Sequence, residues 1–413
     1  MPHPNELNFG LVTAVLSFNT FSQLAACFGR RYFGLPVAAY FDDYDICEPL
    51  STGRSPKRAL NFIHELMGVP LSIGDKDVPS RPSNAFLGVI TDLSRIVEGI
   101  IVMRSKPSRV AKLVLAMQQA CDEGFLSYGE CGRMAGKLEY TVTSASSGLV
   151  GRAALAALRA YQRYQHRQGA DDSEGWMPDY LWIALQFFIE LLPLLPPRVF
   201  DLNRKPRSPV IVYTDAMWAS RAGYAGIVIF DPDHSDTGWP RVRYASAPVP
   251  ELIIGQLDER EQQIGVLEAL AAAAAYSSAP DQLRGRDVVH FIDNTGAMFG
   301  LSRGASRDYD TSRMAHVFQV LAAALSCRVW FEYVPSGANI SDLPSRQDLT
   351  LLRSMGAVEF QLEWPPFGGS WSAVLSSTFA AYSGRRSGAA KRSREEVGGA
   401  LSSLRRKHSR VHV

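Results

Sequence analysis

The sequence predicts an α/β fold, with an α+β amino-terminal part, a helical middle and a carboxyl-terminal mixed five-stranded sheet with helices. Three observations predict it. Residues 1–105 mix strand-like and helix-like apolar patterns, residues 106–204 carry apolar side chains at helical spacing, and residues 205–355 alternate β-branched runs with helical patterns. Hydrophobic residues make up 46% of the 413-residue chain and charged residues 20%, so we expect two or three globular domains.

In the first segment, two helical patterns flank a short hairpin. The helical patterns cover residues 8–29 and 56–67, and the hairpin lies in AAYFDDYDICEP, residues 38–49. The apolar run AFLGVITDL, residues 85–93, follows a stretch rich in turn residues and is expected to form a strand or a hairpin.

The second segment, residues 106–204, is expected to be mostly helical and to end in a linker. Helical spacing covers Val110–Cys121 and Gly148–Tyr164, and QGADDSEGWMP between the helices predicts a polar loop. PPRVFDLNRKPRSP, residues 196–209, has four prolines and mixed charge, which predicts an interdomain linker. The most apolar stretch, residues 180–195, is shorter than the ~20 residues that span a bilayer. We therefore expect a buried helix there and no membrane partner.

The third segment, residues 205–355, changes to a sheet pattern. The predicted helices are Leu257–Ser277 and Thr311–Leu325, and the predicted strands are PVIVYTD, GYAGIVIF, RVRYASAPV, DVVHFIDN and CRVWFEYVP. Three neighbouring strands followed by helix, strand, helix and strand predict a mixed sheet. The tail, residues 366–413, is basic and rich in Gly and Ser, so we expect it to be disordered. Its basic clusters leave three roles open, namely contact with nucleic acid, with an import receptor or with solvent alone.

Charge and cysteine usage constrain the partners and the compartment. The formal net charge is +2, so any surface that binds nucleic acid must be local. The five cysteines form no CxxC pair, which argues against a zinc site or a disulfide framework. They favour a reducing, intracellular compartment, cytoplasmic or nuclear. The start, MPHPNELNFG, has neither the basic nor the apolar region of a signal peptide.

Four acidic residues of the third segment lie in or next to its predicted strands and helices. Asp215 closes VIVYTD, Glu268 lies in IGVLEALAAAAAY, Asp293 closes VVHFID, and Asp342 follows the last predicted strand. Taken singly, such an acid is more typical of a turn, a helix cap or a solvated face. Cleavage of a phosphodiester with two metal ions ~3.5–4 Å apart requires several carboxylates that converge from distant positions.

The order of these acids and the motifs around them resemble the RNase H domain of retroelements. The resemblance covers residues 208–350 and rests on YTDA, LEALA, FIDNTGAM and VPSGANISDLPSR. It implies that Asp215, Glu268, Asp293 and Asp342 hold two Mg²⁺ ions, with Mn²⁺ as an alternative. It also implies that they cut the RNA strand of an RNA–DNA hybrid. Glu261 stays open as an alternative second acid, because it lies about two helical turns before Glu268.

The sequence YFDDYDI resembles the metal-binding hairpin of reverse transcriptases, in particular those of tyrosine-recombinase-type, DIRS-like retrotransposons. The motifs NFGLVTAVLSFN, ELMGVPLSIGDK, SNAFLGVITDL and GRMAGKLEYT accompany it in the order of that family. The resemblance implies a partial polymerase palm in residues 1–105 and a thumb and connection in residues 106–204. It also implies site residues, which are catalytic Asp42 and Asp43, with Asp42 a metal ligand, and nucleic-acid contacts from Lys76, Phe86, Leu87 and Gly88.

Polymerases of this class have a further metal-binding aspartate upstream of the Phe-Gly helix with which this sequence begins. Two metal ions need negative charge from both sides, so we expect no polymerase activity from this chain alone. Three interpretations remain open. The chain is a retroelement fragment, truncated at its amino terminus, with a competent nuclease domain, or it is a non-catalytic relic that at most binds nucleic acid. The third is an unrelated α/β protein in which the four acids occur by chance.

Basic residues predict where a nucleic-acid backbone is bound. Lys106, Arg109 and Lys112 are spaced by three and fall on one helix face. Further candidates are Arg133 with Lys137, and Arg303 with Arg307 after the third acid. The alternative for each set is an ordinary solvated face. We expect recognition through the phosphate backbone and helix shape, with little reading of bases.

Overall fold

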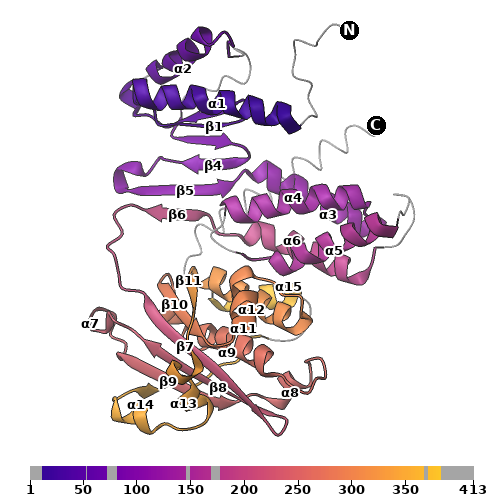
Figure 1. The fold of residues 1–413 in the computed structure, drawn as a ribbon, viewed down its shortest axis with the longest axis vertical. Coiled ribbons are helices and arrows are strands. Elements are labelled where there is room, and N and C mark those ends of the chain that lie inside the picture. Colours follow the sequence, from indigo (N-terminus) through magenta and orange to yellow (C-terminus); the bar gives the residue numbers. More distant parts are fainter. Residues whose placement is uncertain are drawn as a thin grey trace. The chain divides into compact units, whose positions relative to one another are not determined.

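The computed structural model describes residues 12–52, 54–71, 81–145, 149–168, 177–366 and 371–382 (Figure 1). The chain divides into two compact units. The first is Met1–Leu87 with Thr91–Ser94, and the second is Gly88–Ile90 with Arg95–Val413. Helices and strands occur in both units, so the α/β fold class predicted from the sequence is confirmed.

In the first unit, helix α1 (Val12–Phe33) packs against α2 (Ser55–Leu66) and against a small antiparallel sheet. The sheet consists of β1 (Val37–Tyr40) and β2 (Asp43–Ile46), with Tyr40 paired to Asp43. Only Phe41 and Asp42 lie between the strands, and Phe41 has a φ of +53°. The tight hairpin expected around the two aspartates is therefore present.

A second hairpin follows at residues 83–92. Strands β3 (Ser83–Phe86) and β4 (Val89–Asp92) flank Leu87 and Gly88, whose φ angles are +51° and +85°. Two consecutive positive φ angles are what the tightest hairpin turns require. The hairpin predicted from AFLGVITDL is thus confirmed. After the short helix η2 (Ile96–Glu98), strand β5 (Ile100–Ser105) leads into the helical segment.

Four helices of the second unit surround one apolar core, as the spacing of residues 106–204 predicted. Met117, Leu138, Leu158 and Phe188 are fully buried in it. The helices are α3 (Pro107–Glu123), α4 (Tyr128–Ala145), α5 (Arg152–Gln168) and α6 (Asp179–Leu194). The predicted linker is wrong in part, because β6 (Arg198–Asp201) forms within it. Its backbone pairs antiparallel with β5, an interaction that local sequence does not show.

A mixed sheet of six strands follows, in the order β11-β10-β7-β8-β9-β12. β7, β8 and β9 are antiparallel, and β10 and β11 run parallel to β7. The five predicted strands are all present, and the additional sixth has only two residues, too few to show a period. The bounds are β7 (Val210–Ala219), β8 (Ala222–Phe230), β9 (Val242–Pro248), β10 (Asp287–Ile292), β11 (Arg328–Tyr333) and β12 (Val358–Glu359).

Helices cover both faces of this sheet. The Ala-rich α9 (Ile264–Ser278) packs on β7 and β8, and α12 (Tyr309–Leu325) packs on α9 (Figure 1). The short α13 (Asp342–Ser345) packs on β7, β8 and β9. Ile340 and Leu349, on either side of α13, pack against a separate apolar cluster. The remaining helices of this part are α7 (His234–Thr237), α8 (Glu251–Ile254), α10 (Pro280–Leu283), α11 (Thr295–Arg303) and α14 (Thr350–Ser354).

In the sheet part, helices α9 and α11 differ from the sequence prediction. Helix α9 begins at Ile264 and not at residue 257, because the residues before it form a loop. The backbone N–H of Asp258 donates to Asp310 Oδ2 at 2.9 Å, and the Gln263 amide donates to the Asp258 carbonyl at 2.7 Å. Helix α11 was not predicted at all. It is started by Asn294, whose Oδ1 accepts the Ala297 N–H at 3.1 Å.

The helical part and the sheet part share one core. Helix α15 (Trp371–Tyr382) packs on both α6 and α12, and Leu375 of α15 and Val320 of α12 are fully buried in the cluster that α3–α6 build. The expected disorder of the tail is therefore wrong for Trp371–Tyr382, since apolar side chains there are covered on two sides. Residues 383–413, with the basic clusters, lie outside the described residues. In the described ranges, no helix has the length and apolarity needed to cross a membrane.

Leu375→Ala is expected to lower the free energy of unfolding by about 2–5 kcal/mol, because it leaves a cavity in the shared core. Leu351→Ala removes the same atoms from a side chain that is 51% exposed, and is expected to change stability by less than about 0.5 kcal/mol. Urea titrations followed by circular dichroism measure both. Equal effects of the two substitutions would show that α15 does not pack in this core.

Candidate active site

Two parallel strands bring Asp215 and Asp293 to the same level at one end of the sheet. Tyr213 of β7 pairs with Phe291 of β10, and each acid follows two residues later. Because the two strands are parallel neighbours in this register, the two acids lie side by side. The prediction that Asp215 ends its strand is wrong, since β7 continues to Ala219, whereas Asp293 directly follows β10 as predicted.

Glu268 completes a cluster of three carboxylates. It lies on α9, which packs against β7. One oxygen from each of Asp215, Glu268 and Asp293 lies within 4.8 Å of the other two. Oε2 of Glu268 and Oδ1 of Asp293 are buried and accept no hydrogen bond. Buried carboxylate oxygens without a partner are costly, so this donor set fits a bound cation.

Burial and mutual repulsion raise the pKa of two acids in this cluster. The pKa of Glu268 is raised to about 8, chiefly by burial and in part by the nearby charges of Asp293 and Asp215. Burial also raises the pKa of Asp215 to about 6, against the lowering effect of a hydrogen bond from Ser345. Desolvation and like charges both disfavour the ionised form, which is the form that binds metal.

The fourth predicted acid, Asp342, lies beside this cluster and not within it. It is the first residue of α13, and its Oδ1 accepts a hydrogen bond from Arg346 Nε at 2.7 Å. Its charge contributes to the raised pKa of Asp215, so the two carboxylates are near each other. The alternative acid, Glu261, is exposed and precedes α9. The helix face that it was expected to share with Glu268 does not exist.

Two neutral side chains hold the buried acids, and sequence reasoning did not assign either of them a role. The Ser345 hydroxyl donates to Asp215 Oδ2 at 2.5 Å. The Asn294 amide donates to Glu268 Oε1 at 3.3 Å. Both residues stand in the motifs quoted for the resemblance, FIDNTGAM and VPSGANISDLPSR, and this was the signal available for finding them.

A buried histidine ties together the three elements that carry the acids. His290 of β10 bonds through Nε2 to Thr214 Oγ1 of β7 at 2.8 Å, and through Nδ1 to the Tyr276 hydroxyl of α9 at 3.3 Å. Complete burial lowers the pKa of His290 to about 3, so the ring is neutral. This network could not be predicted from the sequence, because His290 lies inside an apolar strand.

The Asp-Asp hairpin of the first unit forms no comparable cluster. Asp42 lies in the turn, Asp43 begins β2, and both are exposed. Within the described residues, no group of three potential metal ligands includes either aspartate. Lys76 lies outside the described residues, while Phe86 and Leu87 stand at the turn of the second hairpin.

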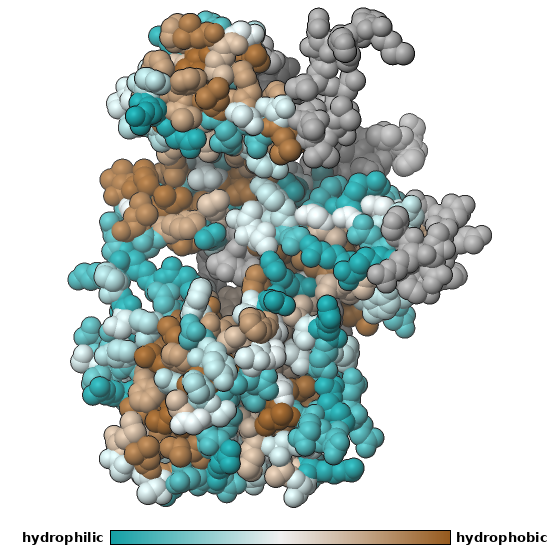
Figure 2. All heavy atoms as spheres, viewed as in Figure 1, coloured by the Kyte–Doolittle hydropathy of each residue, from teal (hydrophilic) through white to brown (hydrophobic). Residues whose placement is uncertain are grey.

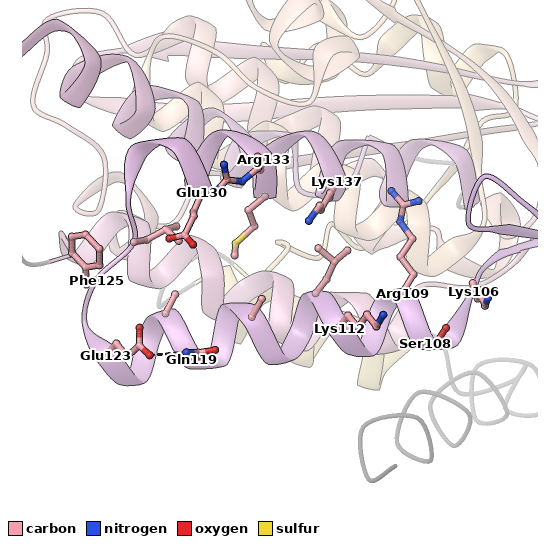
Figure 3. A pocket seen from close by; sticks show the side chains of 15 residues that line it. Lys106, Ser108, Arg109, Lys112, Gln119, Glu123, Phe125, Glu130, Arg133 and Lys137 are labelled. Carbon is pink, nitrogen blue, oxygen red and sulfur yellow. Dashed lines mark hydrogen bonds between the residues drawn. The ribbon is translucent and has the colours of Figure 1, made fainter. Parts of the chain in front are cut away.

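A groove of about 650 Å³ between α3 and α4 unites two of the predicted basic sets (Figure 3). Arg133 and Lys137 of α4 extend toward α3 (Figure 3). Glu123 and Glu130 lie at the end of the groove opposite to the cations of α3. The cations of the first predicted set, which line the groove on the α3 side, are Lys106, Arg109 and Lys112.

The turn at Gly88 is close to this groove. A Cβ atom added to Gly88 would lie 2.4 Å from a guanidinium nitrogen of Arg109, so only glycine lets this side chain pass over the turn. Arg109 also lies over the ring of Tyr140, 4.8 Å from its centre. The predicted contacts Gly88 and Arg109 are thus neighbours in the structure.

The third basic set lies in and after α11. Arg303 is the last residue of this helix, and its guanidinium stands 5.4 Å from the centre of the Phe299 ring. Arg303 and Arg307 are both exposed. They follow Asp293 along the chain, but they do not line the groove between α3 and α4.

The chain is similar to RNase H and reverse-transcriptase structures. No protein-family model and no curated protein matches it. RNase H1 from the halophilic archaeon Halobacterium salinarum NRC-1 is 17% identical, with a TM-score of 0.28, over 34% of this chain and 98% of that chain. The N-terminal RNase H domain of rv2228c from Mycobacterium tuberculosis, fused to maltose binding protein, is 16% identical, with a TM-score of 0.27, over 36% and 99%. The foamy viral protease-reverse transcriptase in complex with an RNA/DNA hybrid is 14% identical, with a TM-score of 0.31, over 80% of this chain and 39% of that chain.

Glu268→Gln is expected to raise the thermal unfolding midpoint in EDTA at about pH 8.5, and to raise it much less at about pH 5. The pKa of Glu268 is about 8 in the folded protein, above the ordinary value of 4.5. Below about pH 4.5, Glu268 is protonated in both the folded and the unfolded protein and does not destabilise the fold. As the pH rises from 4.5 through 8, the unfolded state ionises more easily than the folded state, so the free energy of unfolding falls.

The exposed Glu261→Gln is the matched control and should leave the midpoint unchanged at both pH values. Differential scanning fluorimetry provides the measurement. A gain from Glu268→Gln that does not depend on pH would contradict the assignment of a raised pKa.

Proposed function

We propose that this chain is a retroelement reverse transcriptase/RNase H fragment whose sheet part is an RNase H-type endonuclease. Its substrate is the RNA strand of an RNA–DNA hybrid. One observation carries the proposal. Three carboxylates from three separate elements, β7, α9 and the end of β10, offer oxygens within 4.8 Å of one another, and two of their oxygens have no hydrogen-bond partner.

Mg²⁺ fits this donor set better than a softer metal, because every candidate ligand is a carboxylate oxygen. Asp215, Glu268 and Asp293 hold the ions in this proposal, and Asp342 faces the same site from α13. Mn²⁺ accepts the same ligands. Bound divalent ions would stabilise the attacking and leaving oxygens of the phosphodiester.

The residues of the chain supply negative charge, a fixed orientation of the carboxylates and a site with little water. Asp215 and Glu268 are each only 5% exposed, so little water surrounds these carboxylates where a phosphate would bind. Asp342 is more exposed, and its partner Arg346 is a cation beside the site. Its carboxylate can reorient with less loss than the two buried acids can.

The groove between α3 and α4 is the proposed contact for the nucleic-acid backbone. It combines cations from two helices, and such a cluster attracts phosphates regardless of sequence. Arg303 and Arg307 are proposed as further contacts, and so are Phe86, Leu87 and Gly88 of the second hairpin.

Polymerase activity is not part of the proposal for this chain. Asp42 and Asp43 are exposed, and no third acid among the described residues accompanies them. Purified protein is accordingly expected to extend no primer with Mg²⁺ or Mn²⁺. The alternative function, binding of nucleic acid without turnover, is an outcome of the assay described next.

Wild type with Mg²⁺ is expected to cut the RNA strand of an RNA–DNA hybrid and to leave a DNA duplex intact. Asp293→Asn should lower the rate more than ~100-fold, because the effect of losing a metal ligand exceeds that of losing a hydrogen bond to one. Asp281→Asn makes the same chemical change at an exposed position and should retain the activity. Folded wild type that binds the hybrid without cutting it would favour the non-catalytic alternative.

The double variant Lys112→Ala/Lys137→Ala is expected to weaken hybrid binding. The slope of log K against log salt concentration should become shallower by about 2, since each phosphate contact contributes about 0.9. Lys205→Ala/Arg207→Ala removes two exposed cations outside the groove and is the matched control. Fluorescence anisotropy at several salt concentrations gives the slopes. Equal slopes for both variants would exclude the groove as the binding surface.

A further inference from the structure

Helix α13 lies unusually close to the sheet, directly above the strand next to Asp215. Asp215 of β7 is paired with Gly226 of β8. A Cβ atom added to Gly226 would lie 2.4 Å from both the Ser341 carbonyl oxygen and the Ser345 backbone nitrogen. Only glycine permits this approach, because backbone atoms cannot move aside as a flexible side chain can.

This approach places a buried hydroxyl on the first acid. Ser345 is fully buried, and its Oγ lies 2.5 Å from Asp215 Oδ2. One oxygen of Asp215 is thereby engaged, which fixes the rotation of the carboxylate. Asp215 also accepts a hydrogen bond from the Ala216 backbone N–H, which is likewise neutral.

A similar arrangement exists at the second acid. Asn294 caps α11 by accepting the Ala297 N–H through Oδ1 at 3.1 Å. The cap determines which way the amide points, so that Nδ2 faces Glu268 and donates to Oε1 at 3.3 Å. Oε2 of Glu268 stays without a partner.

We propose that Ser345 and Asn294 are positioning residues that each hold one oxygen of a buried carboxylate and leave the other oxygen to the metal. This inference rests on the proposed function. Neither residue touches the reacting atoms. Their effect is to orient Asp215 and Glu268 before a cation arrives.

The neutrality of both donors is central to the proposal. A cationic partner would compensate the carboxylate charge and compete with a metal ion for it, whereas a hydroxyl or an amide orients the group and leaves its charge intact. The structure shows the contrast, because the more exposed Asp342 has the cationic partner Arg346. The buried Asp215 and Glu268 instead accept from the Ser345 hydroxyl and the Asn294 amide.

The test compares two serines that both hold α13 against the sheet. Ser246 of β9 donates to the Pro344 carbonyl of α13 at 2.6 Å and touches no acid. If Ser345 were only an anchor for α13, Ser345→Ala and Ser246→Ala would have the same effect. Asn294→Ser tests the second position, because serine is also a good helix cap but is too short to reach Glu268.

Mn²⁺ binding is measured by isothermal titration calorimetry on full-length protein without nucleic acid, and hybrid cleavage is measured against Mg²⁺ concentration. Ser345→Ala and Asn294→Ser are expected to weaken Mn²⁺ binding about 10-fold and to raise the half-saturating Mg²⁺ concentration by the same factor. The cleavage rate at saturating Mg²⁺ should fall less. Ser246→Ala should leave Mn²⁺ binding unchanged.

Equal Mn²⁺ affinities of Ser345→Ala and Ser246→Ala would overturn the positioning role. Wild type that binds Mn²⁺ but does not cut the hybrid would refute the proposed nuclease while the calorimetric comparison still decides the role of Ser345 and Asn294. Wild type that binds no Mn²⁺ would overturn both proposals.

Discussion

Repulsion among three clustered carboxylates, two of them buried, is the constraint on which the carboxyl-terminal fold depends. It is visible in the raised pKa values of Glu268 and Asp215, for which burial is the largest cause and neighbouring acids add to it. Without a cation, this arrangement opposes folding. It persists only because the elements that carry the acids are fixed by contacts that do not involve them. Figure 2 shows hydrophobic residues over several parts of the visible face. Leu267, Ala269 and Ile292, which adjoin the acids in sequence, are buried in an apolar core.

Three features provide this fixation. The parallel register of β7 and β10 places Asp215 beside Asp293. His290 links those strands to α9 by two hydrogen bonds, and its neutrality at ordinary pH adds no further charge below the acids. Gly226 lets α13 approach from the opposite face of the sheet. Each feature acts on backbone position, so the acids are placed by the framework and not by attraction for one another.

The elements of this framework could largely be predicted from sequence, whereas the contacts between them could not. The strands that carry Asp215 and precede Asp293 follow from β-branched runs, although β7 continues beyond Asp215 to Ala219. The start of α9 required a tertiary contact of Asp258 with Asp310, and without it Glu261 and Glu268 were indistinguishable. β6 and α15 were missed for a similar reason, since a proline-rich segment and a Gly/Ser-rich tail acquire structure only from β5, α6 and α12. The groove was foreseen as two separate basic sets, because nothing local shows that α3 and α4 face each other.

The packing of the second unit also bears on how one nucleic acid could meet both the groove and the acids. α3 packs on α6, α6 on α15, α15 on α12, and α12 on α9, which carries Glu268. Buried apolar side chains contribute to these helix–helix contacts, and Val320 and Leu375 are among them in the helical core. The distance between the cations of the groove and the carboxylates is therefore set by packed helices and does not depend on the proline-rich segment that connects them in sequence. A duplex that spans both surfaces must match a fixed separation, and helix geometry then becomes a criterion for the substrate even where no base is read.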